Sequence, residues 1–379
     1  MNLRKLCPNF LFPLIQRFAA LPDIALFSFY KLIYKPDPKG VLTVSPSRNS
    51  LSGNHAFIAK ELENSEFTLT HLFEEDCNNR KKRLKALALN RNIILDDYTK
   101  FIYPLTFPKS TKLIQVWHST GAFKRMGFAR MGKSGSTLPT SLTHRNYTHV
   151  IVSSEGVVNN FCEAFGLKPQ KIYPIGVPRT DMFWDEEEKE NIRKDFYEKF
   201  PHLKDKKIIL FAPTFRGDTR EKAHYPKEWF IPENFIKELP EDYVLGLKYH
   251  PFINNEIRIP DNLKDRIINL SNYREINNLL LVTDTLITDY SSVIFEYAFL
   301  NKPIIFYLPD LKEYDRDRSF FYDFSEYLYG TACYKKEDLP NCVLNPESVP
   351  LKRDIFFKKF LNSCDGNSTK RFVDEILRK

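Results

Sequence analysis

The chain has 379 residues, of which 42% are hydrophobic and 14% aromatic. This length is enough for two or three domains of ordinary size, and this composition excludes a mainly disordered, collagenous or low-complexity protein. Lys and Arg together number 56 against 48 Asp and Glu, which gives a formal net charge of +8. Such a moderate excess favours anionic partners such as phosphates or lipid headgroups, and it does not require nucleic acid.

Residues 3–34 form an apolar and aromatic segment that prolines and charged residues interrupt. A membrane-spanning helix needs about 20 uninterrupted apolar residues, so we do not expect this segment to cross a bilayer. It also lacks the small-residue cleavage site of a secretory signal peptide. Either its aromatic residues pack on the body of the protein, or it lies on a membrane surface. In the second case the cations Arg4, Lys5, Arg17, Lys31 and Lys35 meet headgroups, and Phe10, Leu11, Phe12, Leu14, Ile15 and Phe18 enter the lipid.

After Pro36-Asp37-Pro38, short apolar runs alternate with helical stretches, which predicts parallel sheets with helices on both faces. In the first half we expect strands near 41–45, 67–72, 92–95, 112–117 and 148–152. A charged helix near Glu186–Lys199 begins the second half, where strands are expected near 207–212, 243–248, 266–270, 284–288 and 303–307. The sequence therefore predicts an α/β protein with two doubly wound, Rossmann-like domains (39–185 and 186–350). The N-terminal segment (1–38) precedes them, and a C-terminal helix (351–379) crosses back over the first domain.

Ligands of open α/β sheets bind at the carboxyl ends of the strands, so the residues that directly follow each strand are candidates. Four strand ends carry chemically useful residues: 117–121, 213–216, 248–251 and 288–292. His118 precedes a loop with several cations and suits general-base catalysis, because the unperturbed pKa of histidine is about 6.5. His250 is a second candidate, as a donor to a phosphoryl group. The alternative for His118 is a ring that only satisfies the backbone at a strand end.

Asp289-Tyr290-Ser291-Ser292 directly precedes the helical sequence VIFEYAFL. Free N–H groups and hydroxyls at a helix start bind phosphate, and an ordinary N-cap serine is compatible with that role. Glu296 is a candidate to accept hydrogen bonds from a ribose, or it is only a favourable charge near the helix start. Arg216 and Arg318 are candidates for forked contacts to phosphate, although many arginines of a basic protein only face solvent.

One literal motif is dismissed. Residues 127–134 match GxxxxGKS, a pattern that binds nucleotide phosphates only when a strand ends at its first glycine. Here the expected strand ends near Trp117, and Pro139 opposes the required helix. We expect no tightly bound cofactor. Carboxylates with metal-ligand spacing are not evident, so the Mg²⁺ dependence of any activity is left open.

Five segments share a pattern with a known family: VWHSTGAFKRMGF (116–128), THVIVSSE (148–155), ILFAPTFR (209–216), LKYHP (247–251) and TDYSSVIFEYAFLNKPIIFY (288–307). They resemble the CDP-glycerol glycerophosphotransferases of bacterial teichoic acid synthesis. The first motif and the modest length look most like the primase branch, which adds the first glycerol phosphate to a lipid-linked disaccharide.

The resemblance implies a GT-B architecture with a central cleft between an N-terminal acceptor domain and a C-terminal CDP-donor domain. It also implies peripheral attachment to the cytoplasmic face of the cell membrane. The implied reaction transfers glycerol phosphate from CDP-glycerol to a hydroxyl of ManNAc-GlcNAc-diphospho-undecaprenol and releases CMP. The implied catalytic residues are His118 and His250. The implied CDP and phosphate contacts are Thr214, Arg216, Asp289, Ser291, Ser292, Glu296 and Arg318, and the implied acceptor-side loop contains Ser119, Gly121, Lys124 and Arg125.

The chain departs from the family pattern at a few positions. Ser319 stands where the family often has Gly, Tyr329-Gly330 replaces a usual Pro-Gly, and Ser119 stands where many members have Gly or Ala. Three alternatives stay open. In the first, the enzyme carries out the same reaction with CDP-ribitol, or it elongates a teichoic acid or capsule polymer. In the second, the protein is a GT-B glycosyltransferase with a nucleotide-sugar donor. In the third, it is a catalytically silent membrane scaffold.

Overall fold

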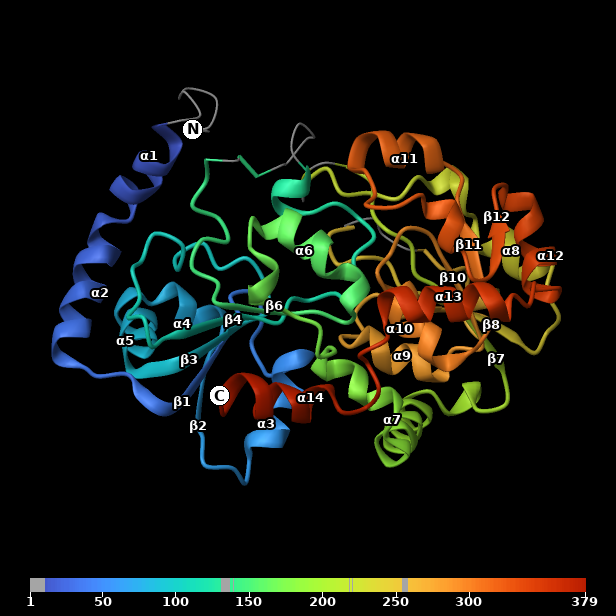
Figure 1. Ribbon diagram of the computed structural model, residues 1–379. Helices are drawn as coiled ribbons and strands as arrows, with labels where there is room; N and C mark the ends of the chain where they lie inside the picture. The colour runs from blue at the N-terminus through green and yellow to red at the C-terminus, as the bar shows by residue number, and fades with distance from the viewer. Residues whose placement is uncertain (1–10, 131–136, 139, 218, 220, 254–257) are drawn as a thin grey trace. The chain divides into compact units, whose positions relative to one another are not determined.

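The computed structural model describes residues 11–130, 137–138, 140–217, 219, 221–253 and 258–379 (Figure 1). Its described residues form two compact units. The first unit contains the chain up to Asp181 together with Asn362–Lys379, and the second contains Met182–Leu361. The divisions therefore fall at 181/182 and 361/362, where the sequence suggested 185/186 and 350/351.

The first unit is built on a six-stranded sheet in the order β2-β1-β3-β4-β5-β6. Its strands are β1 (Asp37–Val44), β2 (Thr68–Leu72), β3 (Asn90–Leu95), β4 (Lys112–Gln115), β5 (His149–Ile151) and β6 (Ile172–Tyr173), and all neighbours are parallel. The five expected strands are confirmed. The two-residue β6 was not expected, because so short a strand leaves no hydrophobic pattern. The strand order reverses between β1 and β3, which is where such sheets bind ligands.

The second unit has a parallel six-stranded sheet in the order β12-β11-β10-β7-β8-β9. Its strands are β7 (Lys207–Phe211), β8 (Tyr243–Leu247), β9 (Ile267–Asn269), β10 (Thr285–Thr288), β11 (Ile304–Tyr307) and β12 (Thr331–Cys333). The five expected strands are again confirmed, and the short β12 was missed. The order reverses between β7 and β10. Both sheets are parallel and alternate with helices, so the predicted α/β class is confirmed.

Helices connect and cover the strands of each unit (Figure 1). In the first unit they are α1 (Phe12–Ala19), α2 (Leu21–Ile33), α3 (Asn54–Leu62), α4 (Glu74–Asn78), α5 (Arg80–Leu89), α6 (Val158–Phe165) and α14 (Ser368–Arg371), which a π-helical turn (Phe372–Leu377) continues. In the second unit they are α7 (Glu186–Lys199), α8 (Pro232–Lys237), α9 (Ile276–Val282), α10 (Val293–Tyr297), α11 (Leu311–Arg318), α12 (Leu339–Leu344) and α13 (Pro350–Phe360). The expected charged helix has the bounds of α7.

The C-terminal stretch does not form the single helix that its periodicity suggested. Helix α13 ends at Phe360 in the second unit, and Gly366 adopts a positive φ of 87° in the turn that follows. Phe372, Val373 and Ile376 are then buried in the core of the first unit beside Val41. The last residues therefore complete the first unit although they follow the second in sequence.

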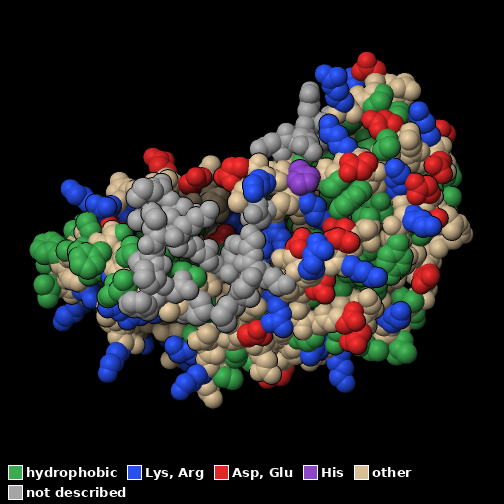
Figure 2. Space-filling model, turned by 90° about the horizontal axis from the view of Figure 1, so that it is seen from above, with side chains coloured by type: hydrophobic (Ala, Val, Ile, Leu, Met, Phe, Trp, Pro, Cys, Tyr) green, Lys and Arg blue, Asp and Glu red, His purple; other side chains and the backbone are tan. Residues whose placement is uncertain are grey.

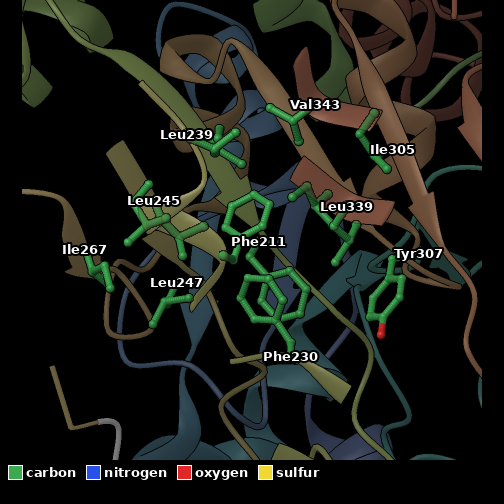
Figure 3. Close-up of a cluster of buried hydrophobic side chains, with 14 of the residues drawn as sticks. Phe211, Phe230, Leu239, Leu245, Leu247, Ile267, Ile305, Tyr307, Leu339 and Val343 are labelled. Atoms are coloured by element: carbon green, nitrogen blue, oxygen red, sulfur yellow. The ribbon is translucent and has the colours of Figure 1, made fainter. Parts of the chain in front are cut away.

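A cluster of buried side chains forms the core of the second unit on one face of its sheet (Figure 3). Phe211 of β7 stacks on Phe230, with ring centroids 3.9 Å apart, and Leu245 and Leu247 of β8 pack in the same cluster. A parallel sheet is covered on both faces, so its strands read as continuous apolar runs. Burying each such side chain contributes about 1.5–3 kcal/mol, which holds the strand ends at fixed positions.

The N-terminal helices pack on the first unit through one face of α2, and the membrane-surface interpretation of residues 3–34 stays a prediction. Pro13 and Pro22 lie in the first turns of α1 and α2, where proline is tolerated, so they begin helices and do not break them. One face of α2 packs on the unit: Asp23 pairs with Arg80 at 2.6 Å and with Arg83 at 2.5 Å, and Phe27 is buried. Arg4, Lys5 and Phe10 lie outside the described residues.

The other face of the helix pair is exposed and apolar (Figure 2, left). Its exposed residues are Leu14, Phe18, Leu21, Phe29, Leu32 and Ile33. Lys31, expected at headgroups, instead donates to the carbonyl oxygen of Thr106 at 2.7 Å. Within the described part of the chain, no helix is long and apolar enough to span a membrane.

Candidate active site

His118 follows β4 at the carboxyl edge of the first sheet. The chain turns there through Trp117, which is buried and has a positive φ of 54°. Gln115 Oε1 accepts a hydrogen bond from the Trp117 N–H at 2.9 Å, and Asn54 Nδ2 donates to the Trp117 carbonyl at 2.8 Å. A bulky residue in this conformation costs about 1–3 kcal/mol. Side chains therefore bond both the N–H and the carbonyl group of Trp117 and hold the turn in place.

The His118 side chain is 42% exposed, and its Nδ1 faces oxygen atoms. Nδ1 lies 3.3 Å from the carbonyl oxygen of Asp96 and 3.6 Å from Asp97 Oδ1. A carbonyl oxygen can only accept, so a neutral His118 carries its proton on Nδ1 and keeps the Nε2 lone pair. The pKa of His118 lies below 6.5, because desolvation of the ring, assisted by Arg179, outweighs the opposing charge of Asp97. The ring is thus neutral near pH 7, as a general base must be.

A buried polar cluster lies at the strand-order reversal between β1 and β3. Ser45 Oγ lies 3.0 Å from His55 Nδ1 and donates to Asp96 Oδ2 at 3.2 Å. Arg48 Nε lies 3.5 Å from the same carboxylate. Burial lowers the pKa of His55. This cluster fixes Asp96, whose backbone carbonyl in turn fixes the His118 ring.

The expected acceptor-side loop follows His118 directly. The Gly121 N–H donates to Ser153 Oγ at 3.2 Å, with φ at 67°, a conformation that favours glycine. Arg125 Nη1 bonds Glu163 of α6 at 2.6 Å, so Arg125 carries an ion pair of its own. Ser119 and Lys124 are half-buried. The dismissed GxxxxGKS pattern begins twelve residues after β4 ends, in a 3₁₀ turn (Gly127–Arg130), and its Lys133 and Ser134 lie outside the described residues.

In the second unit, Thr214 and Asp289 meet at the reversal between β7 and β10. Asp289 Oδ1 accepts from the backbone N–H groups of Thr214 at 2.7 Å and Tyr290 at 2.6 Å. Asp289 is 1% exposed, so it acts as a scaffold and presents no surface to a nucleotide. The Thr214 hydroxyl is buried and has no hydrogen-bond partner among the described residues.

Arg216, which was expected to contact phosphate, is bonded to other groups of the protein. Its Nε and Nη2 donate to the two carboxylate oxygens of Asp310 at 2.7 and 2.8 Å, and its Nη1 donates to the Thr214 carbonyl at 2.6 Å. Nη2 also lies 3.0 Å from Asp289 Oδ2. Four aromatic rings surround the guanidinium, those of Tyr225, Trp229, Tyr290 and Tyr314. All three nitrogens are engaged, so Arg216 organises the strand ends and does not present a free fork.

His250 follows β8, and its Nδ1 accepts a hydrogen bond where His118 Nδ1 donates one. Its Nδ1 accepts a hydrogen bond from the Phe252 N–H at 3.1 Å, so a neutral ring carries its proton on Nε2. The rings of Phe215 and Phe252 lie 4.8 and 4.6 Å from it, centroid to centroid. Nearby Lys248 is buried and donates to the Ser271 carbonyl at 2.8 Å. His250 therefore presents an N–H donor where His118 presents a lone pair.

The remaining predicted residues lie on α10 and α11. Ser292 is the N-cap residue of α10 without a side-chain cap bond, and Ser291 Oγ accepts only a long bond from the Val293 N–H at 3.5 Å. Glu296 is 1% exposed, so the ribose contact expected of it does not fit its burial on the inner face of α10. Arg318, the last residue of α11, donates to the Gly217 carbonyl and lies over the Phe215 ring.

Sequence reasoning missed Asp97, Arg179 and Asp310. Asp97 follows β3 and Asp310 follows β11, so the strand-end rule, applied to every strand, would have found both. Arg179 follows the unexpected β6, and its Nη1 donates to the His118 carbonyl at 3.0 Å. Among the described residues, no group of three or more His, Cys, Asp or Glu side chains is arranged to hold a metal ion.

Comparison with known proteins identifies the family. Residues 26–378 match the model of the family described as CDP-Glycerol:Poly(glycerophosphate) glycerophosphotransferase. The chain is 39% identical over 374 residues to a teichoic acid poly(ribitol-phosphate) polymerase of Bacillus spizizenii, covering 96% of this chain and 60% of that protein. It is 36% identical to a teichoic acid glycerol-phosphate primase of Bacillus subtilis, covering 77% of this chain and 76% of the primase. The chain belongs to this family, and it spans about three fifths of the length of the polymerase it matches.

A solved structure has the same fold. The wall teichoic acid polymerase TagF superposes with a TM-score of 0.77 at 23% identity, covering 96% of this chain and 95% of that one. At this identity the likeness concerns the fold. The relatives that the chain matches include polymerases and primases of teichoic acid synthesis.

Proposed function

We propose that the protein transfers a polyol phosphate from a CDP-polyol to an acceptor hydroxyl of a growing teichoic acid and releases CMP. The observation that carries this proposal is the opposite protonation of two histidines at strand ends. Nδ1 of His118 faces the Asp96 carbonyl, whereas Nδ1 of His250 accepts from a backbone N–H. One ring suits proton abstraction, and the other suits hydrogen bonding to a phosphate.

In the proposed reaction, Nε2 of His118 takes the proton of the acceptor hydroxyl while its oxygen attacks the phosphorus that carries the polyol. The bond between this phosphorus and the bridging oxygen breaks, and CMP leaves with that electron pair. His250, Ser291 and Ser292 contact the diphosphate, and Arg216 acts by holding Asp289 and Asp310 in place. Positioning and preorganised donors supply most of the acceleration in phosphoryl transfer.

We propose CDP-ribitol as the preferred donor and chain elongation as the reaction. The support is the identity to ribitol-phosphate polymerases, 39% for the Bacillus spizizenii protein. The second candidate is transfer of the first glycerol phosphate from CDP-glycerol, which the first motif suggested and which the 36% identity to a glycerol-phosphate primase supports. The GT-B cleft implied by the family stays a prediction.

We further propose that the enzyme works at the cytoplasmic membrane surface, where a lipid-linked acceptor is located. The exposed apolar face of α1 and α2 supports this, because an interfacial helix places such side chains among the acyl chains. The N-terminal residues Arg4 and Lys5 and the overall charge of +8 favour anionic headgroups.

The test of donor and reaction is nucleotide release by the purified protein. CDP-ribitol and CDP-glycerol are supplied separately and in competition, with an unprimed lipid-disaccharide analogue or with the same analogue carrying one polyol phosphate. The proposal expects acceptor-dependent CMP, fastest from CDP-ribitol with the primed analogue, and a product with many added units. Preference for CDP-glycerol with a single added unit would select the priming reaction, and release of a nucleoside diphosphate from a nucleotide sugar would overturn both.

A further inference from the structure

We propose that Arg179 binds a phosphate of the acceptor, so that the preferred acceptor carries a phosphodiester one polyol unit away from the attacking hydroxyl. This inference rests on the proposed function, because it concerns the acceptor that His118 deprotonates. It adds a binding residue to the His118 site, and it adds the chemical class of acceptor that this residue recognises.

Arg179 and the two residues that precede His118 bond the same buried side chain, that of Asn54. Asn54 Oδ1 accepts from the Arg179 N–H at 3.0 Å, and Asn54 Nδ2 donates to the carbonyls of Val116 at 3.1 Å and Trp117 at 2.8 Å. Asn54 is 4% exposed at the start of α3. The Arg179 guanidinium reaches the His118 carbonyl at 3.0 Å. One amide thus fixes the backbone at Arg179 relative to the backbone that leads into His118, and the guanidinium bonds His118 directly, as a substrate contact beside the base requires.

The carboxylate closest to Arg179 in sequence, that of Asp181, is bonded to the start of α14. Asp181 lies in the same 3₁₀ turn (Pro178–Phe183), but it points to α14. Its oxygens accept from the N–H groups of Ser368 at 3.0 Å and Thr369 at 2.7 Å, and from the Thr369 hydroxyl at 2.7 Å. The turn therefore places the Asp181 carboxylate against α14 and the Arg179 guanidinium against His118.

A cation fixed beside a general base opposes catalysis, because it disfavours the imidazolium that forms when the base takes a proton. An acceptor phosphate bound to Arg179 cancels this repulsion when the reacting hydroxyl arrives. Guanidinium binds phosphate by paired, charge-assisted hydrogen bonds. In a chain of polyol phosphates, one glycerol or ribitol separates the terminal hydroxyl from a phosphodiester, so the phosphate is within reach of a residue that flanks the base.

The test compares two soluble acceptors, a disaccharide that carries one polyol phosphate and the same disaccharide without it. Their dissociation constants are measured by calorimetry, and KM and kcat are measured from CMP release. Arg179→Gln keeps a donor for the His118 carbonyl and removes the charge, Arg179→Lys keeps a charge without the fork, and exposed Arg145→Ala is the control. We expect the wild type to bind the phosphorylated acceptor at least tenfold more tightly than the other.

This preference should disappear in Arg179→Gln, return in part in Arg179→Lys and persist in Arg145→Ala, while the KM of the CDP donor does not change. Equal binding of the two acceptors by the wild type overturns the inference, and so does a wild-type preference in Arg179→Gln. Equal losses for both acceptors in Arg179→Gln would reveal only a structural role and also overturn it. Absence of CMP release by the wild type from every CDP-polyol would instead overturn the proposed function.

Discussion

At the scale of single residues, the atoms around each ring assign different chemistry to the two histidines. The sequence predicted that both follow strands, because apolar runs end just before them. It could not predict their tautomers, because these depend on Asp96, which lies 22 residues from His118, and on the local turn at Phe252. For the same reason the sequence could not predict the partners of Arg216 or the burial of Glu296, which depend on the packing of distant elements.

Asp97 is predicted to tune the base. The neutral form of His118 is active, so kcat/KM should fall as the pH drops through its pKa, which lies below 6.5. The Asp97 charge raises this pKa, so Asp97→Asn should move the acid limb of the profile to lower pH. It should also slow the reaction by about tenfold or more, because the imidazolium loses its counter-charge. The measurement is CMP release from pH 5 to 8, about the range over which histidine titrates, and an acid limb that stays in place or moves upward in Asp97→Asn would contradict this role.

Ser319 is predicted to be strained. It ends α11 with φ at 62° and ψ at 145°, a region that only glycine enters without steric cost. This explains physically why glycine is suited to the position at which the chain departs from the family pattern. Ser319→Gly should raise the free energy of unfolding by about 1 kcal/mol, measured by urea denaturation. A decrease in stability would show that the serine side chain makes a contribution larger than the strain.

At the scale of elements, ten strands were predictable from apolar runs, including the three-residue β5 and β9, whereas β6 and β12 were not. The strands β6 and β12 have two and three residues, and they are defined by pairing with neighbours that already exist. The amphipathic pattern of residues 355–377 suggested one helix, but Asp365-Gly366-Asn367 interrupts it. For α1 and α2, the prolines that seemed to break helices begin them. One face of α2 packs on the first unit, and a membrane contact of the other face stays a prediction.

The exposed face of α1 and α2 is predicted to bind membranes. Phe18 and Leu32 are 73% and 86% exposed, so replacing both with Asp removes apolar contacts without disturbing the core. The double variant should lose at least tenfold in binding to vesicles that contain anionic phosphatidylglycerol, measured by co-sedimentation, and keep its circular dichroism spectrum. Leu351→Asp, at an equally exposed position of α13 in the second unit, is the matched control. Unchanged vesicle binding by the double variant would remove this face from the membrane contact.

At the scale of the whole molecule, the sequence predicted two parallel sheets because buried strands are continuous apolar runs separated by helices. It predicted on which strands the reactive residues lie, since the carboxyl ends of parallel strands share one edge of each sheet. It did not predict how those residues are supported. Arg216 reaches an aspartate 94 residues away, and the chain end returns to fill the core of the first unit.

The most direct test of the central claim is acceptor-dependent CMP release by purified wild type, His118→Ala, His250→Ala and the control His202→Ala, an exposed histidine. All four proteins are first shown to fold by circular dichroism. We predict that each of the two strand-end variants loses at least about a hundredfold in kcat, the usual effect of a lost acid–base or phosphate-stabilising group. His202→Ala should match the wild type. A folded His118→Ala enzyme that releases CMP at the wild-type rate would contradict the account.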